Sequence, residues 1–416
     1  MISLNHVWHG AVGAISLLLI GILLSADRKA IRWRPLLAAL AVQIGVGCLA
    51  LFFPAGRTAI HAVAEVVNTG LAYGNAGIQF MFGGLVSDRM LSVFPGDGFV
   101  FALRVLPEVI YVSALLSLFY YWGVMQFLAR VVGKALQAVL RVEEIEAFSA
   151  VLTIFLGMVE MPFAIRPYLA LLSGEELFTV MSSGTASISG SVLTAYSSLG
   201  IRMDYLLAAS CMAIPGGLLF AKLLLPTKGS VARGPGLDKM EQRPANIFEA
   251  TALGVMSGTK IALSVGAMLI GFISIIALMN GLISYFGGLA GYPTLSLQGI
   301  FGVILSPVAW LIGVPWIHCQ EVGAIIGQKA VFNEFVAYTS LAPMIRSAAL
   351  DPRTIAISIF ALCGFANLAS VGVLLGAFGG VCPERRTEVA RLGLRAVTAG
   401  MLSNLMSAAI AGVFVS

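Results

Sequence analysis

Charged residues are scarce in this sequence, and their scarcity limits the class of protein. Only 11% of the 416 residues are charged and 59% are hydrophobic, whereas a soluble globular domain carries about 25% charged residues. Apolar stretches recur at about 20 residues, the length of a helix that spans a bilayer. We therefore predict an all-α polytopic membrane protein with one membrane domain and no separate aqueous core.

Other residue types are too few or too scattered for several functions. The five cysteines lie in or near apolar segments without CxxC spacing, as small core residues do. The sequence contains neither HExxH nor GxSxG, and no second histidine is placed to partner His318, so an intramembrane enzyme lacks candidate site residues. The net charge of +5 comes from loop clusters without interleaved aromatics, which argues against a nucleic-acid partner.

The N-terminal apolar run, residues 10–24, comes before a basic cluster that contains Arg28 and Lys29. A cleavable signal peptide has the opposite order. We therefore predict a first spanning helix at residues 9–25 with the N-terminus outside, because basic turns stay in the cytoplasm. Counting the later crossings with their basic turns inside gives eight transmembrane helices and a C-terminus outside.

Two short polar interruptions fall within apolar surroundings, at residues 157–162 and 333–337. Each contains a carboxylate, Glu160 or Glu334, at a depth where a charge costs about 2.5–3.5 kcal/mol. Broken membrane segments are tolerated only where they face protein or a water-filled cavity, and paired breaks are typical of a transporter's site at the membrane midplane. We predict that these interruptions are the tips of two re-entrant hairpins.

Two further helices have polar middles. One starts at the capping box Ser173-Gly174-Glu175-Glu176 and is rich in serine and glycine over residues 182–191. The other starts at Asp351-Pro352 and carries Asn367 and Ser370 near its middle. Small polar residues permit local unwinding that frees carbonyls for an ion; tight helix packing is the alternative explanation.

An amphipathic helix is predicted at residues 124–142, lying in the membrane interface. Its predicted polar face consists of five residues at spacings of four, four, three and four: Gln126, Arg130, Lys134, Gln137 and Arg141.

The two halves of the chain repeat the same features. Glu160 and Glu334 are 174 positions apart, and Ser189 and Asn367 are 178 apart. We predict N-terminal helices and an interfacial segment at 1–95, a first inverted repeat at 96–225, a cytoplasmic linker at 226–257 and a second inverted repeat at 258–416. Inverted repeats that meet at the midplane suit alternating access.

The breaks and their flanks resemble the concentrative nucleoside transporters. The similar stretches are Gly157-Met158-Val159-Glu160-Met161-Pro162, residues 181–196, Asn333-Glu334-Phe335-Val336-Ala337, Gly364-Phe365-Ala366-Asn367-Leu368 and Gly400-Met401-Leu402-Ser403-Asn404. The resemblance extends from about residue 100 to the C-terminus. It implies a bacterial nucleoside permease of the inner (plasma) membrane, coupled to Na+ or H+, homotrimeric, with a hairpin-bearing transport domain that moves between the two faces.

The resemblance also implies roles for individual residues. Met158, Val159, Glu160 and Val192 would face the base of the nucleoside, and Glu334, Asn367 and Ser370 would hold the ribose hydroxyls with Phe365 nearby. Sodium would be bound by Thr153, Ser187 and the carbonyls of Leu156 and Ile188. A structural pair with Lys329 is the alternative role for Glu334.

Three departures from the family pattern affect specificity. Met158 and Val159 replace a glutamine and a hydroxyl residue, so recognition of the base must differ. Thr153 replaces a common asparagine, which leaves a proton carried on Glu160 as an alternative to sodium. His318 stands near the start of the second hairpin and could titrate near neutral pH, or serve as a hydrogen-bonded interfacial residue. A proton-coupled permease for another ribosyl or small polar solute, and a channel, are the remaining alternatives.

Overall fold

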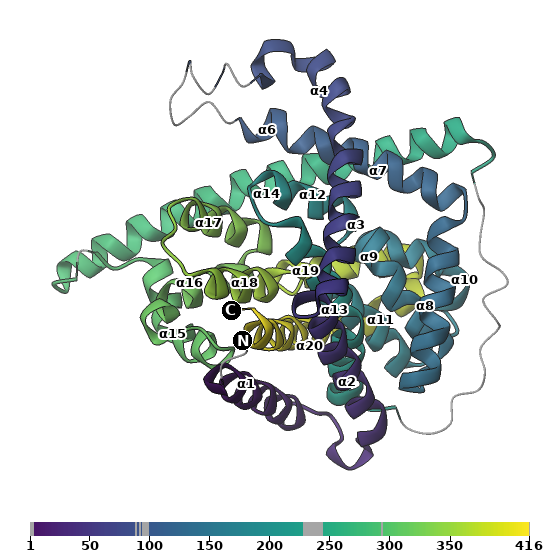
Figure 1. Ribbon diagram of the computed structural model, residues 1–416, viewed down its shortest axis with the longest axis horizontal. Helices are drawn as coiled ribbons and strands as arrows, with labels where there is room; N and C mark the ends of the chain where they lie inside the picture. Colours follow the sequence, from purple (N-terminus) through teal and green to yellow (C-terminus); the bar gives the residue numbers. More distant parts are fainter. Residues whose placement is uncertain are drawn as a thin grey trace.

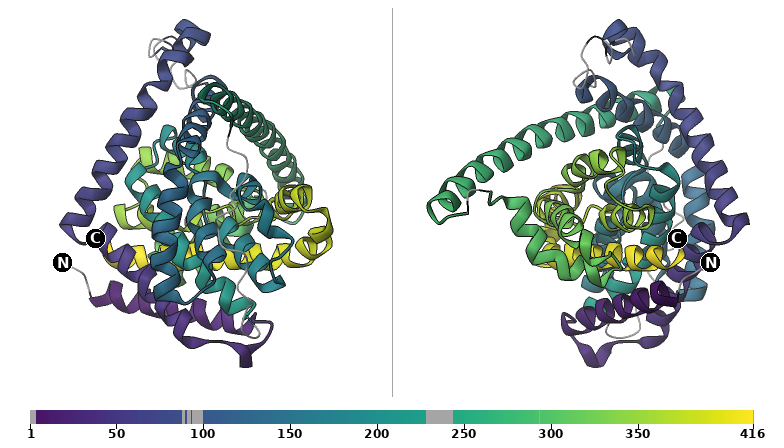
Figure 2. Two further views of the ribbon diagram at one scale, coloured as in Figure 1. Left: turned by 90° about the vertical axis from the view of Figure 1, so that its right-hand side faces the viewer. Right: turned by 60° about the vertical axis from the view of Figure 1, so that its left-hand side comes forward.

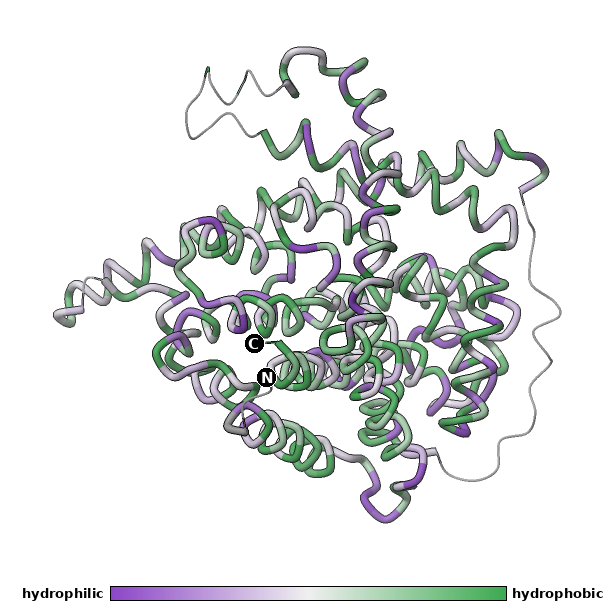
Figure 3. Tube along the Cα trace, in the orientation of Figure 1, coloured by the Kyte–Doolittle hydropathy of each residue, from purple (hydrophilic) through white to green (hydrophobic). Residues whose placement is uncertain are grey.

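The computed structural model describes residues 4–87, 90, 93, 100–227, 244–292 and 294–415, and every regular element within these ranges is helical (Figure 1). Half of the predicted linker, residues 228–243, lies outside them. Figure 3 shows hydrophobic residues along most helices, with hydrophilic residues concentrated in connections such as the turn after α1. The prediction of an all-α polytopic membrane protein is confirmed.

Seven helices are long and apolar enough to cross a membrane. Six of them are candidate spans without a marked break: α1 (Leu4–Leu23), α2 (Trp33–Leu51), α7 (Leu106–Tyr121) with the short α6 (Phe101–Arg104), α13 (Met203–Leu224), α14 (Ile247–Leu289) and α20 (Arg386–Phe414). The seventh is the broken α9. Two interrupted pairs, counted with those six, give the predicted number of eight spans: α11 (Gly174–Ala186) with α12 (Gly190–Ser198), and α18 (Pro352–Leu362) with α19 (Ala369–Val381).

The first predicted interruption is a single-residue break. Gly157 has φ 78° and ψ 175° inside α9 (Glu144–Ala164), and the short α10 (Arg166–Leu169) follows. A positive φ is readily adopted by glycine, which has no Cβ. Helical geometry resumes after Gly157, so the predicted break over residues 157–162 was too wide.

The second interruption lies between α16 (Cys319–Val331) and α17 (Glu334–Arg346). Asn333 caps α17, because its side chain accepts a bond from the Val336 amide at 2.8 Å. Glu334 is therefore the first residue of a helix, where the helix dipole favours a negative charge.

The remaining helices complete the described chain. They are α3 (Pro54–Ala72), α4 (Gly74–Phe82), α8 (Val124–Leu140), α15 (Leu297–Leu311) and the 3₁₀ turns η1 (Arg28–Ala30), η2 (Gly83–Val86), η3 (Trp316–His318) and η4 (Pro383–Arg385). On α8, Arg130 and Lys134 are exposed as predicted. Gln126 is buried and donates to the Tyr120 carbonyl, so its assignment to the polar face was wrong.

The long helix α14 runs along the periphery in Figures 1 and 2. Its 43 residues give a length of about 65 Å at 1.5 Å per residue, well beyond the roughly 30 Å of bilayer core. We predicted that the second repeat begins only at residue 258. The helix already starts at Ile247, so the last part of the predicted linker is helical.

Helix α20 is the central element of the described chain. It packs against α1, α11, α13, α18 and α19, and its C-terminal end lies beside the start of α1, where Gly10 contacts Val413. The start of the first helix and the end of the last are therefore neighbours.

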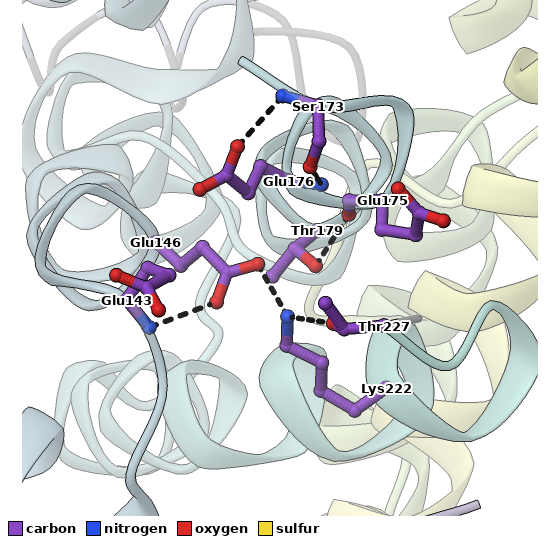
Figure 4. Close-up of polar contacts among 8 residues, drawn as sticks. All are labelled: Glu143, Glu146, Ser173, Glu175, Glu176, Thr179, Lys222 and Thr227. Carbon is purple, nitrogen blue, oxygen red and sulfur yellow. Dashed lines mark hydrogen bonds and ion pairs between the residues drawn. The ribbon is translucent and has the colours of Figure 1, made fainter. Parts of the chain in front are cut away.

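Capping boxes begin α9 and α11, and one ion pair connects α9 to α13 (Figure 4). At the start of α9, Glu146 accepts from the Glu143 amide at 3.1 Å and from Lys222 Nζ at 2.5 Å. Lys222 also donates to Thr227 at 2.9 Å. The predicted capping box at Ser173 and Glu176 is present at the start of α11. Glu146 is therefore both a helix cap and a buried counter-ion.

Replacing Glu146 tests this double role. Glu146→Gln should lower the free energy of unfolding by about 3 kcal/mol, because Lys222 loses its carboxylate while remaining largely buried. Glu176→Gln is the matched control: it alters the equivalent cap, which has no ion pair within the described chain, and should cost less than about 1 kcal/mol. Thermal unfolding of the detergent-purified proteins measures both; equal losses would contradict the role of the ion pair.

Candidate functional site

The two interrupted helices are bonded to each other at their breaks. The Phe365 amide donates to the Ser187 carbonyl at 3.2 Å. The side-chain amide of Asn404, from α20, donates to the carbonyls of Ala186 at 2.7 Å and Cys363 at 2.8 Å. A Cβ on Gly364 would lie 2.2 Å from Asn404 Oδ1, so this close approach requires glycine. The breaks are therefore a single bonded unit.

Lys329 brings a fully buried positive charge to the same unit. Its ammonium donates to the Ala361 carbonyl and to Asn404 Oδ1, both at 2.7 Å. The C-terminal end of a helix, where Ala361 lies, is electronegative and favours a cation. Lys329 is therefore hydrogen-bonded to α18 and α20, and it interacts with Glu334 through space without a direct ion pair in the described chain.

Glu334 is 5% exposed and is bonded through both carboxylate oxygens. Oε1 accepts from the hydroxyl of Tyr196 at 2.9 Å, and Oε2 accepts from Asn367 Nδ2 at 3.0 Å. A carboxylate offers about four lone-pair sites, so each oxygen retains the capacity to accept another donor.

Asn367 and Ser370 form the other half of this cluster. The amide and the hydroxyl of Ser370 donate to Asn367 Oδ1 at 2.9 and 3.1 Å. The hydroxyl also lies 2.5 Å from the Phe365 carbonyl. The structure thus brings together Glu334, Asn367, Ser370 and the Phe365 backbone, four of the positions that the sequence predicts at the sugar.

The residues of the first hairpin tip are divided between two environments. Met158 is buried and contacts Gly184 of α11, and Val192 is buried in α12. Val159 is 46% exposed. Glu160 is half-buried and accepts a bond from the Ser257 hydroxyl of α14. Its carboxylate is thus bonded to the peripheral helix and not to the Glu334 cluster.

The predicted ion ligands lie where the hairpin tip meets the first break. A Cβ on Gly157 would lie 2.7 Å from the Ser189 Cβ, which shows how closely these segments approach. Thr153 and Ser187 are buried and donate to the carbonyls of Ser149 and Ser183, and each hydroxyl oxygen keeps lone pairs. The Leu156 carbonyl directly precedes the Gly157 break, and Ile188 lies between α11 and α12.

These ligands fit an alkali cation. All are hard oxygen donors, and the C-terminal carbonyl ends of α11 and of the first arm of α9 are electronegative. Within the described residues, no group of three His, Cys, Asp or Glu residues could hold a metal ion. The donor set is therefore unlike a transition-metal site.

Sequence reasoning did not identify three of the bonded residues: Tyr196, Ser257 and Asn404. Tyr196 and Asn404 lie inside stretches singled out by their resemblance, but their partners come from distant parts of the chain. His318, the last residue of η3, is half-buried at the start of α16.

Three family models match successive parts of the chain. They describe the Na+ dependent nucleoside transporter N-terminus, over residues 12–85, nucleoside recognition, over 102–203, and the Na+ dependent nucleoside transporter C-terminus, over 205–412. The putative nucleoside permease NupX of Escherichia coli is 47% identical, with 98% of this chain and 99% of that protein covered. These matches are to transporters and permeases, so the intramembrane enzyme alternative is excluded.

Solved structures match over nearly the whole chain. CNTnw in an inward-facing substrate-bound state is 47% identical, with a TM-score of 0.94 and 99% of each chain covered. A doubly substituted CNTnw in an outward-facing state is 46% identical, with a TM-score of 0.96 and the same coverage. Sequence and fold agree. The chain therefore belongs to the Na+ dependent nucleoside transporter family.

Proposed function

We propose that this protein imports nucleosides by cation symport, with sodium as the favoured coupling ion. The observation that carries the proposal is the buried cluster of Glu334, Asn367 and Ser370, placed between the second hairpin and the second broken helix. A buried carboxylate in a membrane protein is costly and marks a functional site. Here the carboxylate keeps acceptor capacity beside amide and hydroxyl groups.

The cluster suits the vicinal hydroxyls of a ribose. Glu334 accepts from hydroxyl donors, while Asn367 keeps a second amide N–H to donate and the Ser370 oxygen keeps lone pairs to accept. A hydrogen bond to a charged group contributes about 1.5–3 kcal/mol, so losing one should weaken binding about tenfold or more. Phe365, partly buried beside the cluster, would cover the sugar.

The base would meet a mostly apolar surface. Met158, Val159 and Val192 offer no hydrogen-bonding side chain, and Glu160 is bonded to Ser257. A site without hydrogen-bond partners discriminates weakly between isosteric ligands. We therefore propose that the ribosyl group contributes more to recognition than any particular base.

Sodium would be bound by Thr153, Ser187 and the carbonyls of Leu156 and Ile188. One cation that crosses at about 100 mV supplies roughly 2.3 kcal/mol, near fiftyfold accumulation of solute. The alternative is a proton carried on Glu160.

We further propose elevator-type alternating access, with residues 96–225 and 258–416 as inverted repeats. The chain resembles CNTnw in both inward-facing and outward-facing states to a similar degree. The exposed apolar residues of α14, including Leu263 and Ile270, would belong to a scaffold that faces lipid and the other subunits of a homotrimer. The site of action would be a bacterial inner membrane with both termini outside.

Uptake into proteoliposomes tests the symporter. Radiolabelled uridine or adenosine should accumulate against its gradient when an inward sodium gradient is imposed. A pH gradient alone should drive accumulation only if the proton is the coupling ion. Simple equilibration that neither gradient affects would refute symport and favour a channel.

In the same assay, Glu334→Gln should abolish nucleoside uptake while the protein still purifies as a folded oligomer. Glutamine keeps the shape of the side chain but loses the charge and one acceptor oxygen. Glu176→Gln serves as the control for a buried glutamate outside the cluster. Near-normal uptake by Glu334→Gln would remove Glu334 from the ribose site.

The first hairpin tip allows a test of base recognition. The double substitution Met158→Gln with Val159→Thr restores polar groups toward the base and should change the ranking among uridine, cytidine, adenosine and guanosine by about tenfold for at least one nucleoside. Competition against labelled uridine gives the ranking. If the order and ratios stay the same, these side chains do not contact the base.

A further inference from the structure

Tyr196, in the predicted first repeat, is hydrogen-bonded to Glu334, the buried carboxylate of the predicted second repeat. It lies on α12, the second half of the first broken helix, and is fully buried. Its hydroxyl donates to Glu334 Oε1 at 2.9 Å across 138 positions of sequence. A buried tyrosine hydroxyl needs a partner, and here the partner is the group that the proposed function assigns to the sugar.

The ring of Tyr196 is held by two aromatic neighbours from α17. Its centroid lies 5.1 Å from that of Phe335 and 4.4 Å from that of Tyr338. Aromatic packing at these distances restricts the ring beyond simple burial. The phenol oxygen is therefore presented to Glu334 from a restricted position.

The carboxylate is consequently held at both oxygens by different elements. Tyr196 reaches Oε1 from α12, and Asn367 reaches Oε2 from the segment after α18. Lys329, the nearby buried amine, donates its hydrogen bonds to Ala361 and Asn404 and not to the Glu334 carboxylate. A binding group whose rotamer is fixed by supporting hydrogen bonds recognises its ligand more sharply than a free one.

We propose that Tyr196 is a positioning residue that fixes the Glu334 carboxylate for the vicinal hydroxyls of the sugar. The proposal rests on the proposed function, because it assumes that Glu334 accepts from those hydroxyls. Tyr196 does not contact the sugar itself. Its removal weakens ligands that carry the hydroxyls and leaves ligands without them unaffected.

The test compares uridine, 2′-deoxyuridine, 3′-deoxyuridine and 2′,3′-dideoxyuridine as competitors of labelled uridine uptake. In Tyr196→Phe, the inhibition constant of uridine should rise about tenfold, while that of 2′,3′-dideoxyuridine stays within about twofold. The ratio of the inhibition constant of 2′,3′-dideoxyuridine to that of uridine should therefore fall about tenfold. A parallel weakening of all four compounds would overturn the proposal, since it would indicate only a structural role.

Tyr338→Phe is the matched control. Tyr338 is also fully buried, belongs to the same aromatic group and loses one buried hydroxyl bond, to the Ile359 carbonyl at 3.0 Å. It does not bond to Glu334. It should therefore keep the wild-type preference among the four compounds, and a loss equal to that of Tyr196→Phe would contradict the assignment.

A second replacement covers the case in which Tyr196→Phe does not fold. With 4-aminophenylalanine at position 196, an N–H donor remains at the para position, and the preference for the hydroxyls should stay near wild type. Loss of the preference in this variant would overturn the proposal. If the unmodified protein itself fails to prefer uridine over 2′,3′-dideoxyuridine, the ribose role of Glu334 fails instead, so the two failures are distinguishable.

Discussion

Where a membrane helix breaks, its unpaired backbone N–H and C=O groups must find hydrogen-bond partners inside the protein. The side-chain amide of Asn404 meets this constraint for both breaks. Its nitrogen donates to Ala186 and Cys363, the carbonyls at the ends of the two half-helices, and its oxygen accepts from Lys329. An unsatisfied group at this depth costs several kcal/mol. This explains why α20 is central and why glycine stands at position 364.

Two buried ionisable groups of the second hairpin have different hydrogen-bond partners near these breaks. Lys329 is bonded near the C-terminal end of α18, and Glu334 is the first residue of α17. Each charge therefore lies at the helix end whose dipole favours it. Because Lys329 has other partners, Glu334 is left with hydrogen-bond donors from Tyr196 and Asn367 and with acceptor capacity for a ligand.

Much of this architecture could be predicted from local sequence signals. The capping residues Ser173 and Asp351 begin helices as predicted, and Gly157 and Asn333 mark the breaks, because capping and positive φ depend on a few neighbouring residues. The all-α membrane class follows from composition.

The same local sequence signals could not predict tertiary partners. Gln126 fits the spacing of a polar face, yet it is buried because Tyr120 offers it a carbonyl. In the sequence, Tyr196 does not differ from other aromatic residues. Its bond to Glu334 becomes apparent only when α17 and α12 are placed together in the fold. Likewise, nothing in the local sequence shows that Lys329 is bonded to Asn404 and not to the nearby Glu334.

Glu160 and Glu334, the two carboxylates from which the site was predicted, have different hydrogen-bond partners. The Glu334 side chain accepts hydrogen bonds from the broken-helix unit, from Tyr196 on α12 and from Asn367 after α18. Glu160 is bonded to Ser257 on the peripheral α14. A displacement of the hairpins along α14 would therefore break the Glu160 bond while leaving the Glu334 cluster intact. Under the proposed elevator motion, the proposed sugar-binding geometry would then be the same on both faces of the membrane, and the contact that changes would lie at Glu160.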